Sequence, residues 1–181
     1  MSIRPAAAGD AAALAALYAP YVTDSTISFE TEPPGAAGFR ERIAAGGPLY
    51  PWLVACGEDG AVLGYACASP FRPRPAYRFT VETSVYLARE AAGRGIGRTL
   101  YAALLETLAA QGFAQAIGAI SLPNPASVAL HKRLGFVHAG TYEEVGFKLG
   151  RWISVGLWQR ALAPPADPPR EPRPFAEVWR D

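Results

Sequence analysis

The chain is poor in the residues that build disulfide scaffolds and metal centres. Its 181 residues include 2 cysteines, 2 histidines and 1 methionine, and charged residues make up 18% of the total. Disulfide-rich and cysteine-ligated metal proteins carry more cysteine, in clusters such as CxxC, which this sequence lacks. The formal net charge of +1 gives no electrostatic reason to expect nucleic acid or an anionic membrane as a partner. We therefore expect no metal, no nucleic acid and no membrane among the ligands.

Long hydrophobic runs are also missing. No apolar stretch approaches the roughly 18 residues that cross a bilayer, and residues 1–4 lack the apolar segment of a signal peptide. Half of the residues are nonetheless hydrophobic, which excludes a disordered chain. These features predict a cytoplasmic protein with a single domain over residues 1–162 and a proline-rich surface tail over residues 163–181. Cys56 and Cys67 lie in apolar stretches, where buried free thiols are expected.

Hydrophobic periodicity predicts a mixed succession of helices and strands. Asp10 is a suitable N-cap for an opening helix, and Phe39 and Ile43 share the inward face of a second, short helix. The further elements are expected, in order, as a hairpin of strands over 52–56 and 62–68, a long strand over 78–87, a helix from 96 that ends at Gly112, a strand over 116–120, a helix over 125–134, and strands over 136–147 and 152–159. Strand-helix-strand units require part of the sheet to be parallel, so the predicted class is α/β, a mixed layer of sheet and helices.

A glycine-rich turn, Gly93-Arg94-Gly95-Ile96-Gly97, joins the long strand to its helix. Glycine lets the backbone approach an anion closely, and the first amides of a helix have no partner within it. Neither the P-loop pattern nor the dinucleotide pattern GxGxxG is satisfied, because Arg98 stands where each would need another residue. The turn therefore predicts a phosphate-binding corner of another kind, with an ordinary glycine-capped turn as the alternative.

A second turn precedes the helix at residues 125–134. In it, Asn124 and Ser127 follow a proline and carry short polar side chains. Such residues commonly cap a helix, which is the structural interpretation.

With both turns in view, the sequence resembles the GNAT superfamily of N-acetyltransferases, and within it the phosphinothricin and methionine sulfoximine acetyltransferases. The resemblance covers roughly residues 3–159. It is carried, in chain order, by IRPA at 3–6, FETEP at 29–33, PWLVA at 51–55, TVETSVYL at 80–87, GIG at 95–97, LPN at 122–124, SV at 127–128, LH at 130–131, LGF at 134–136, GFK at 146–148 and GRW at 150–152. It implies a GNAT-like fold, in which helices flank a central, mixed, twisted sheet whose central strands splay apart.

The resemblance also implies that acetyl-CoA is the cosubstrate. Its pyrophosphate would lie on the glycine turn and its pantetheine arm would pair with the long strand. The residues implied for this are Val85, Tyr86, Leu87, Gly93, Arg94, Gly95, Ile96, Gly97, Arg98, Thr99, Asn124 and Ser127. The family usually has Gln or Arg where this chain has Ala92, and a weaker affinity is the most that we expect from this difference.

Two residues are candidates for catalysis. Glu82 lies on the polar face of the long strand, alone among acidic residues between Asp59 and Glu90. Acetyl transfer to an amine requires a proton acceptor, and the resemblance places the base of the family here; a solvated carboxylate is the alternative. His131 matches the histidine of the phosphinothricin group and could protonate the leaving sulfur or relay a proton, unless it is a histidine packed under the sheet.

The acceptor pocket is less specific in the sequence. Phe29, Arg72 and Arg74 match positions near the acceptor of the family, and guanidinium groups suit a carboxylate or phosphinate. Solvated loop arginines are the alternative. Leu149 and Ser154 depart from the family pattern near this pocket.

The sequence thus predicts an acetyl-CoA-dependent N-acetyltransferase that acts on a small amino-acid-like amine, such as phosphinothricin, methionine sulfoximine or methionine sulfone. A different acceptor, such as a polyamine, an aminoglycoside or a protein N-terminus, and a catalytically silent CoA-binding module are the alternatives. The group pairs as homodimers, so a homodimer is expected.

Overall fold

The computed structural model describes residues 1–164 and 166–180. Seven strands form one sheet in the order β1-β2-β3-β4-β5-β7-β6. The strands are β1 (Ser2–Pro5), β2 (Trp52–Cys56), β3 (Val62–Pro70), β4 (Thr80–Leu87), β5 (Gln115–Ser121), β6 (Val137–Lys148) and β7 (Arg151–Ala161). The α-helices are α1 (Ala11–Thr23), α2 (Ala36–Ala45), α3 (Ile96–Gln111), α4 (Pro125–Arg133) and α5 (Phe175–Val178). None of the helices in these residues is long and apolar enough to cross a membrane.

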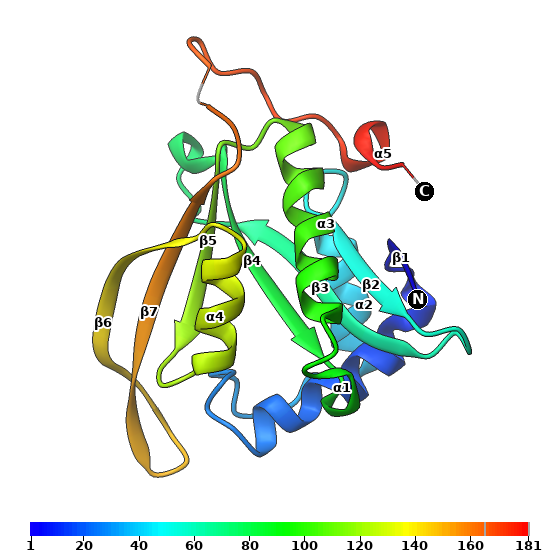
Figure 1. Cartoon of the computed structure of the whole chain (residues 1–181), viewed down its shortest axis with the longest axis vertical. Coiled ribbons are helices and arrows are strands. Elements are labelled where there is room, and N and C mark those ends of the chain that lie inside the picture. Colours follow the sequence, from blue (N-terminus) through cyan, green and yellow to red (C-terminus); the bar gives the residue numbers. More distant parts are fainter. Residues whose placement is uncertain (165, 181) are drawn as a thin grey trace.

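Helices cover both faces of the sheet, and each face has its own core. In Figure 1, α3 and α4 lie in front of the sheet, and α1 and α2 lie behind and below it. Leu100, Leu104 and Leu108 of α3 are fully buried in the front core, as the four-residue spacing predicts. The rear core contains Leu14 and Tyr18 of α1. The predicted α/β class, with helices on both faces of one sheet, is confirmed.

The sheet is antiparallel except between β4 and β5. These two strands pair in parallel over three residues each, Thr80 to Glu82 with Gln115 to Ile117. They then diverge (Figure 1), while β4 stays paired with β3 as far as Leu87. The edge of β4 that faces β5 is therefore open from residue 83 onward in the described part of the chain. This divergence creates the space in which the candidate site lies.

Three local expectations need correction. Asp10 does not cap α1, because its carboxylate is held by the Arg4 guanidinium at 2.8 Å and by the Ala7 amide. The pairing with Arg4 joins β1, which the sequence analysis did not predict, to the start of α1. Cys56 is buried, as expected, but Cys67 is only partly buried because it faces a cavity. The long strand predicted over 78–87 begins at Thr80, because a short 3-10 helix over Pro75–Tyr77 comes just before it.

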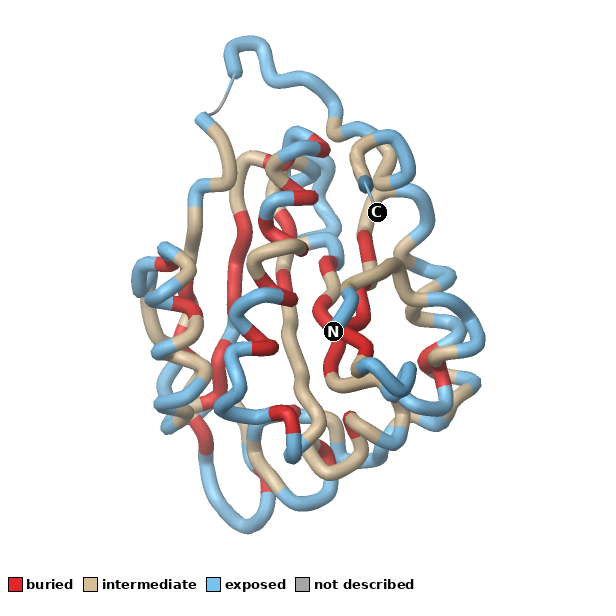
Figure 2. Tube along the Cα trace, turned by 45° about the vertical axis from the view of Figure 1, so that its right-hand side comes forward, coloured by how far each residue is buried: buried red, intermediate tan, exposed pale blue. Residues whose placement is uncertain are grey.

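The proline-rich segment returns to the body of the protein. Residues 166–171 are exposed, and Figure 2 shows the corresponding loop as a pale excursion at the top of the molecule. Beyond it, Phe175 and Trp179 pack against the front core. The segment thus ends in the short helix α5, which the sequence analysis did not predict. The division into a domain over 1–162 and a tail remains a prediction.

Candidate active site

A groove runs along the open edge of β4 toward the start of α3. Its volume is about 460 Å³. It is lined by Tyr21, Ile27, Val85, Tyr86, Leu87, Ala92, Gly93, Gly95, Gly97, Arg98, Asn124, Ala126, Ser127, Ala129, Leu130 and Arg133. We call this the β4 groove. Strand backbone, helix amides and short side chains make up much of its lining.

The glycine turn supplies one end of the β4 groove. Gly93 and Gly95 have φ angles of 75° and 81°, in the left-handed region that favours glycine. The amides of Arg98 and Thr99 donate the first hydrogen bonds of α3, both to the Gly95 carbonyl. The amides before Arg98 therefore have no partner within the helix, at the end where its dipole favours an anion. This geometry fits a phosphate group.

The structure brings most of the predicted CoA-binding residues together. Nine of the twelve line the β4 groove: Val85, Tyr86, Leu87, Gly93, Gly95, Gly97, Arg98, Asn124 and Ser127. Arg94 and Ile96 instead line a separate hollow beside Met1 and Leu63. The Thr99 hydroxyl donates back to the Gly95 carbonyl, at 3.4 Å. Asn124 caps α4, because its side-chain oxygen accepts from the Ser127 amide at 3.1 Å. The cap and a place in the groove are compatible.

The strand edge in the groove can pair with an extended ligand. The Ala88 amide donates to Leu63 on the β3 side, so the backbone groups of Leu87 point the other way, toward β5. The Leu87 carbonyl accepts from the Tyr21 hydroxyl at 2.7 Å. An open strand edge beside unpaired helix amides suits a ligand that carries both amide and phosphate groups. Coenzyme A has both, so the residues present fit it.

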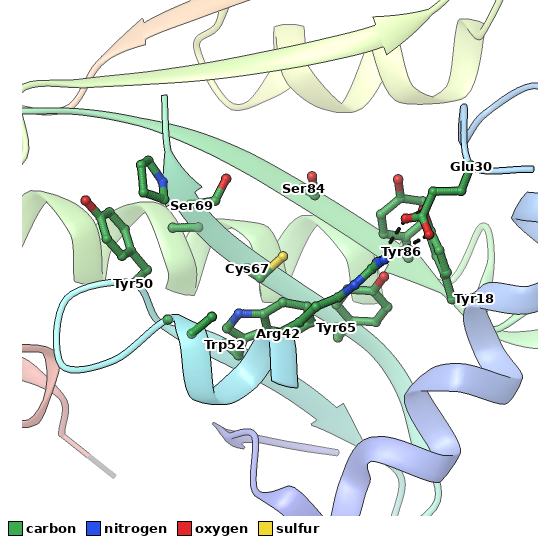
Figure 3. Close-up of a pocket in the computed structure, with 14 residues that line it drawn as sticks. Tyr18, Glu30, Arg42, Tyr50, Trp52, Tyr65, Cys67, Ser69, Ser84 and Tyr86 are labelled. Atoms are coloured by element: carbon green, nitrogen blue, oxygen red, sulfur yellow. Dashed lines mark hydrogen bonds and ion pairs between the residues drawn. The ribbon is translucent and has the colours of Figure 1, made fainter. Parts of the chain in front are cut away.

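A second cavity lies on the opposite side of β4, against α1 and α2. Its volume is about 360 Å³, and it is lined by Tyr18, Glu30, Arg42, Ala45, Gly46, Tyr50, Trp52, Tyr65, Cys67, Ala68, Ser69, Pro70, Ser84 and Tyr86 (Figure 3). We call it the aromatic cavity, because Trp52, Tyr65 and Tyr86 form a stacked wall, with ring centroids 5.5 and 5.4 Å apart. Tyr86 lines both this cavity and the β4 groove. The two therefore meet at β4.

An ion pair closes one end of the aromatic cavity. Arg42 donates from both terminal nitrogens to the two carboxylate oxygens of Glu30, at 2.9 and 2.8 Å. The Tyr18 hydroxyl donates to the same carboxylate at 2.9 Å. The hydrogen bond from Arg42 lowers the pKa of Glu30 below its ordinary value, so the carboxylate stays charged. Because Glu30 occupies the guanidinium fork, Arg42 fixes α2 to the loop that carries Glu30 and does not present its fork to a substrate anion.

Glu82 does not line the aromatic cavity, but it lies on the same face of β4 as Ser84, which does. Its register partner on β3 is Ser69, which also lines the cavity. Burial raises the pKa of Glu82 above its ordinary value, and the positive charge of Arg72 opposes that shift. A carboxylate with a raised pKa is a better proton acceptor than a solvated one. The partly buried position favours the interpretation as a base over that of a solvated side chain.

His131 lies on the other face of the sheet. Its Nδ1 donates to the Ser127 carbonyl at 2.8 Å, which leaves Nε2 to accept from the Tyr101 hydroxyl at 3.2 Å. Tyr101 in turn contacts Thr83, a neighbour of Glu82 that points to the opposite face of β4. Burial lowers the pKa of His131, so the ring is neutral near pH 7. The structure does not bring His131 and Glu82 together on one face, and the contacts of the ring agree with the packed interpretation.

The predicted acceptor residues lie outside the aromatic cavity. Arg72 and Arg74 are exposed on the loop after β3, with Arg72 over the Phe71 ring. Phe29 is 41% exposed and packs against Gly146 of β6. The cavity is formed instead chiefly by residues to which the sequence analysis gave no role, namely Glu30, Arg42, Trp52 and Tyr65, together with Tyr86, which it expected to bind CoA. Glu30 lies in the FETEP motif and Arg42 lies on the next helix, but no pattern in the sequence indicates that these two residues pair.

The positions that depart from the family pattern fall in different places. Ala92 lines the β4 groove. Leu149 is exposed at the turn between β6 and β7, where its φ is 50°. The Ser154 hydroxyl donates to Glu143 on β6, so it ties the two strands of this hairpin together. In residues 1–164 and 166–180, no group of three His, Cys, Asp or Glu side chains is placed to hold a metal ion.

Comparison with known proteins identifies the family. A sequence model described as the acetyltransferase (GNAT) family matches residues 14–136. The chain belongs to the GNAT acetyltransferases. The predicted GNAT-like fold and acetyl-CoA-dependent acetyl transfer are therefore confirmed for this chain.

Individual relatives narrow the comparison. The chain is 42% identical to a phosphinothricin N-acetyltransferase of Streptomyces viridochromogenes, over 98% of this chain and 96% of the relative. It is 38% identical to an L-methionine sulfoximine/L-methionine sulfone acetyltransferase of Pseudomonas aeruginosa, over 93% and 98%. A crystal structure of a phosphinothricin acetyltransferase from Sinorhizobium meliloti, in complex with acetyl-CoA, superposes with a TM-score of 0.89 at 39% identity, over 96% of this chain and 97% of that one.

Proposed function

We propose that this protein transfers the acetyl group of acetyl-CoA to the amine of a small amino-acid-like substrate of the phosphinothricin or methionine sulfoximine type. The observation that carries the proposal is the meeting of the β4 groove and the aromatic cavity at Tyr86, on the same strand and the same face as Glu82 and Ser84. The groove suits the cosubstrate, and the cavity is the size of a small molecule. The relatives named for these acceptors match nearly the whole chain.

In a direct attack of the amine on the thioester, the carboxylates of Glu82 and Glu30 have different roles. The amine nitrogen must be neutral to form the new C–N bond, so a proton leaves it for Glu82, directly or through water. Burial favours this, because it raises the pKa of the Glu82 carboxyl toward that of an effective base. The charged Glu30 carboxylate stays bound to Arg42 and is not available as a base.

The thioester end of the reaction relies on backbone groups. As the C–N bond forms and the C–S bond breaks, negative charge develops on the carbonyl oxygen, and a donor near it lowers the barrier. The open edge of β4 near Leu87 can supply an amide for this purpose. The thiolate then leaves; since an ordinary thiol has a pKa of about 8.5, protonation assistance has a small effect.

A role for His131 in protonating the sulfur or relaying a proton remains a prediction. Its ring is neutral, and its two nitrogens are bound to the Tyr101 hydroxyl and to the Ser127 carbonyl. We expect His131→Asn to reduce kcat less than Glu82→Gln does. Thermal unfolding of both variants separates this effect from a loss of folded protein.

The test of the proposal is thiol release from acetyl-CoA in the presence of a panel of amines. Phosphinothricin and methionine sulfoximine should be turned over with a higher kcat/KM than spermidine, an aminoglycoside or a peptide N-terminus. Glu82→Gln should lower kcat by about 10²- to 10³-fold, the usual effect of a general base, with unchanged binding of CoA. Binding of CoA without turnover of any amine would favour a silent CoA-binding module. Equal loss of CoA binding and rate in Glu82→Gln would make that residue structural.

We also propose that the protein forms a homodimer in the cytoplasm. The β6–β7 hairpin supports the dimer, because it exposes Val137, Tyr142, Val145, Phe147, Leu149 and Trp152, each at least 49% accessible. An exposed apolar surface of this kind commonly marks an interface. Light scattering on the purified protein should give about twice the mass of 19.2 kDa for one chain. A monomeric mass at micromolar concentration would contradict it.

A further inference from the structure

One wall of the aromatic cavity is built by a loop and not by the sheet. Residues 46–50 join α2 to β2 and contribute Gly46 and Tyr50 to the lining. Figure 3 shows Tyr50 at the opposite end of the cavity from the pair of Glu30 and Arg42. We call residues 46–50 the wall loop. Its position sets the length of the space that is available to an acceptor.

The wall loop is anchored by two parts of the chain that are distant in sequence. The Leu49 carbonyl accepts a hydrogen bond from the Gln111 side-chain nitrogen at 2.9 Å. The Pro48 carbonyl accepts from the Phe175 amide at 2.7 Å. Consecutive carbonyls of the loop are thus held by the end of α3 and by the start of α5.

Gln111 connects these two anchors. Its side-chain nitrogen also donates to the Arg173 carbonyl at 2.9 Å, and the Arg173 amide donates to the Gln111 carbonyl at 2.7 Å. The residue is 1% exposed and is the last one of α3. The side-chain nitrogen is thus paired with two acceptors, whereas the buried Oε1 atom has no hydrogen-bond partner among the described residues. Because an unpaired buried polar atom is costly, the two hydrogen bonds of the nitrogen are the contribution that explains a glutamine at this point.

The C-terminal segment has its own contacts with the body of the protein. The Arg173 guanidinium donates to the Ala110 carbonyl at 2.7 Å. Phe175 and Trp179 pack on the front core with their ring centroids 5.6 Å apart. Figure 1 shows this red segment passing the upper end of α3, whereas the glycine turn lies at the lower end. The 16 residues of α3 separate the two ends by about 24 Å.

We propose that Gln111 and residues 173–179 are positioning elements for the acceptor, because they hold the wall loop of the aromatic cavity in place. This proposal rests on the proposed acetyl transfer to a small amine. Neither Gln111 nor the segment lines the aromatic cavity or the β4 groove. Their effect is therefore on the affinity for the acceptor and not on the affinity for acetyl-CoA.

Two variants with matched controls test the proposal. Gln111→Met keeps the approximate side-chain volume and removes both donors, and Gln115→Met is its control, since Gln115 pairs with Gln159 away from the wall loop. Phe175→Pro removes the ring and the amide that binds Pro48, whereas Phe175→Ala removes the ring alone. Proline suits the first position of a helix, where Phe175 lies. The comparison of these two variants isolates one hydrogen bond.

Two measurements decide the outcome. Hydrogen exchange, followed by mass spectrometry, should accelerate in the peptide that covers residues 46–50 of Gln111→Met and stay unchanged in the peptide that covers residues 92–99. The KM for phosphinothricin should rise about five- to tenfold in Gln111→Met, as expected for the loss of one or two hydrogen bonds, and the KM for acetyl-CoA should stay within twofold. Relative to Phe175→Ala, Phe175→Pro should also raise the KM for phosphinothricin and leave the KM for acetyl-CoA within twofold. Gln115→Met should change neither the hydrogen exchange nor the KM for phosphinothricin.

The proposal is overturned if exchange at residues 46–50 is unaltered, or if it accelerates without a change in the acceptor KM. It is also overturned if both KM values rise together. A wild-type protein that acetylates no small amine would instead contradict the proposed function, and the exchange measurement would still report whether Gln111 holds the wall loop.

Discussion

The two cavities on either side of β4 are built from different materials. The β4 groove combines an open strand edge, helix amides and left-handed glycines at Gly93 and Gly95 with side chains from α1 and α4. The aromatic cavity consists of large side chains from α1, α2, β2, β3 and β4, fixed by ring stacking and by the pair of Glu30 and Arg42. Backbone amides bind the phosphate and amide groups of the cosubstrate, which is the same molecule whatever the acceptor is. A site made of side chains can vary with the acceptor.

This difference predicts which substrate each substitution affects. Changes in backbone conformation at the glycine turn should weaken the binding of CoA, and changes in side chains of the aromatic cavity should weaken the binding of the acceptor.

The glycine turn should be the most sensitive point of the β4 groove. Gly95→Ala places a side chain in a left-handed conformation at a cost of roughly 1–2 kcal/mol, so the turn should rearrange and withdraw its amides. The dissociation constant of CoA, measured by calorimetry, should rise tenfold or more. Gly112→Ala is the control, since Gly112 is left-handed too, has no neighbouring atom within 4 Å of an added methyl, and lies at the far end of α3.

Gly112→Ala should lower thermal stability by a similar amount and leave CoA binding within twofold of wild type. If both glycine variants weaken CoA equally, the effect is general destabilisation and the turn has no special role.

The ion pair should matter for the acceptor. Arg42→Met leaves Glu30 with the Tyr18 hydroxyl as its remaining charge-stabilising partner in the cavity and frees α2 from the loop that carries Glu30. We expect the acceptor KM to rise about threefold to tenfold and Tm to fall by about 2–4 °C, as for a change of about 1 kcal/mol in a protein of this size. Arg40→Met, at an exposed position of the same helix, should change neither quantity. If the KM for acetyl-CoA rose by the same factor, the aromatic cavity would not act on the acceptor alone.

The pH dependence of the rate should report the charge next to Glu82. The base works in its ionised form, so kcat/KM should fall as the pH drops through the raised pKa of Glu82. Arg72 lowers the pKa of Glu82, and its replacement in Arg72→Met should therefore move this acid limb to higher pH by a fraction of a unit. Arg74→Met should leave the limb in place. Movement of the limb to lower pH in Arg72→Met would contradict the assignment of the limb to Glu82.

Much of the fold follows from local patterns. The four-residue spacing of leucines gave α3, alternation gave β4, and Gly112 ends α3 in the left-handed conformation that was expected of it. The exceptions depend on distant partners. β1 consists of four residues that are stable because they pair with β2, and α5 exists because Phe175 and Trp179 pack on the core. Asp10 had two possible partners, the helix amides and Arg4, and their relative energies depend on where β1 lies.

The sequence by itself determined the class of the fold, because strand alternation and helical spacing act on the chain locally, and its resemblance to the GNAT acetyltransferases indicated the family. It also predicted the glycine turn, since left-handed conformations at Gly93 and Gly95 depend on the residues themselves. The tertiary structure decided which side chains surround the acceptor. Glu30, Arg42 and Tyr50 line the same cavity from separate parts of the chain, and the wall loop is held by Gln111 and by the returning C-terminal segment. Contacts between residues more than sixty positions apart depend on how the layers pack, and no local pattern in the sequence encodes them.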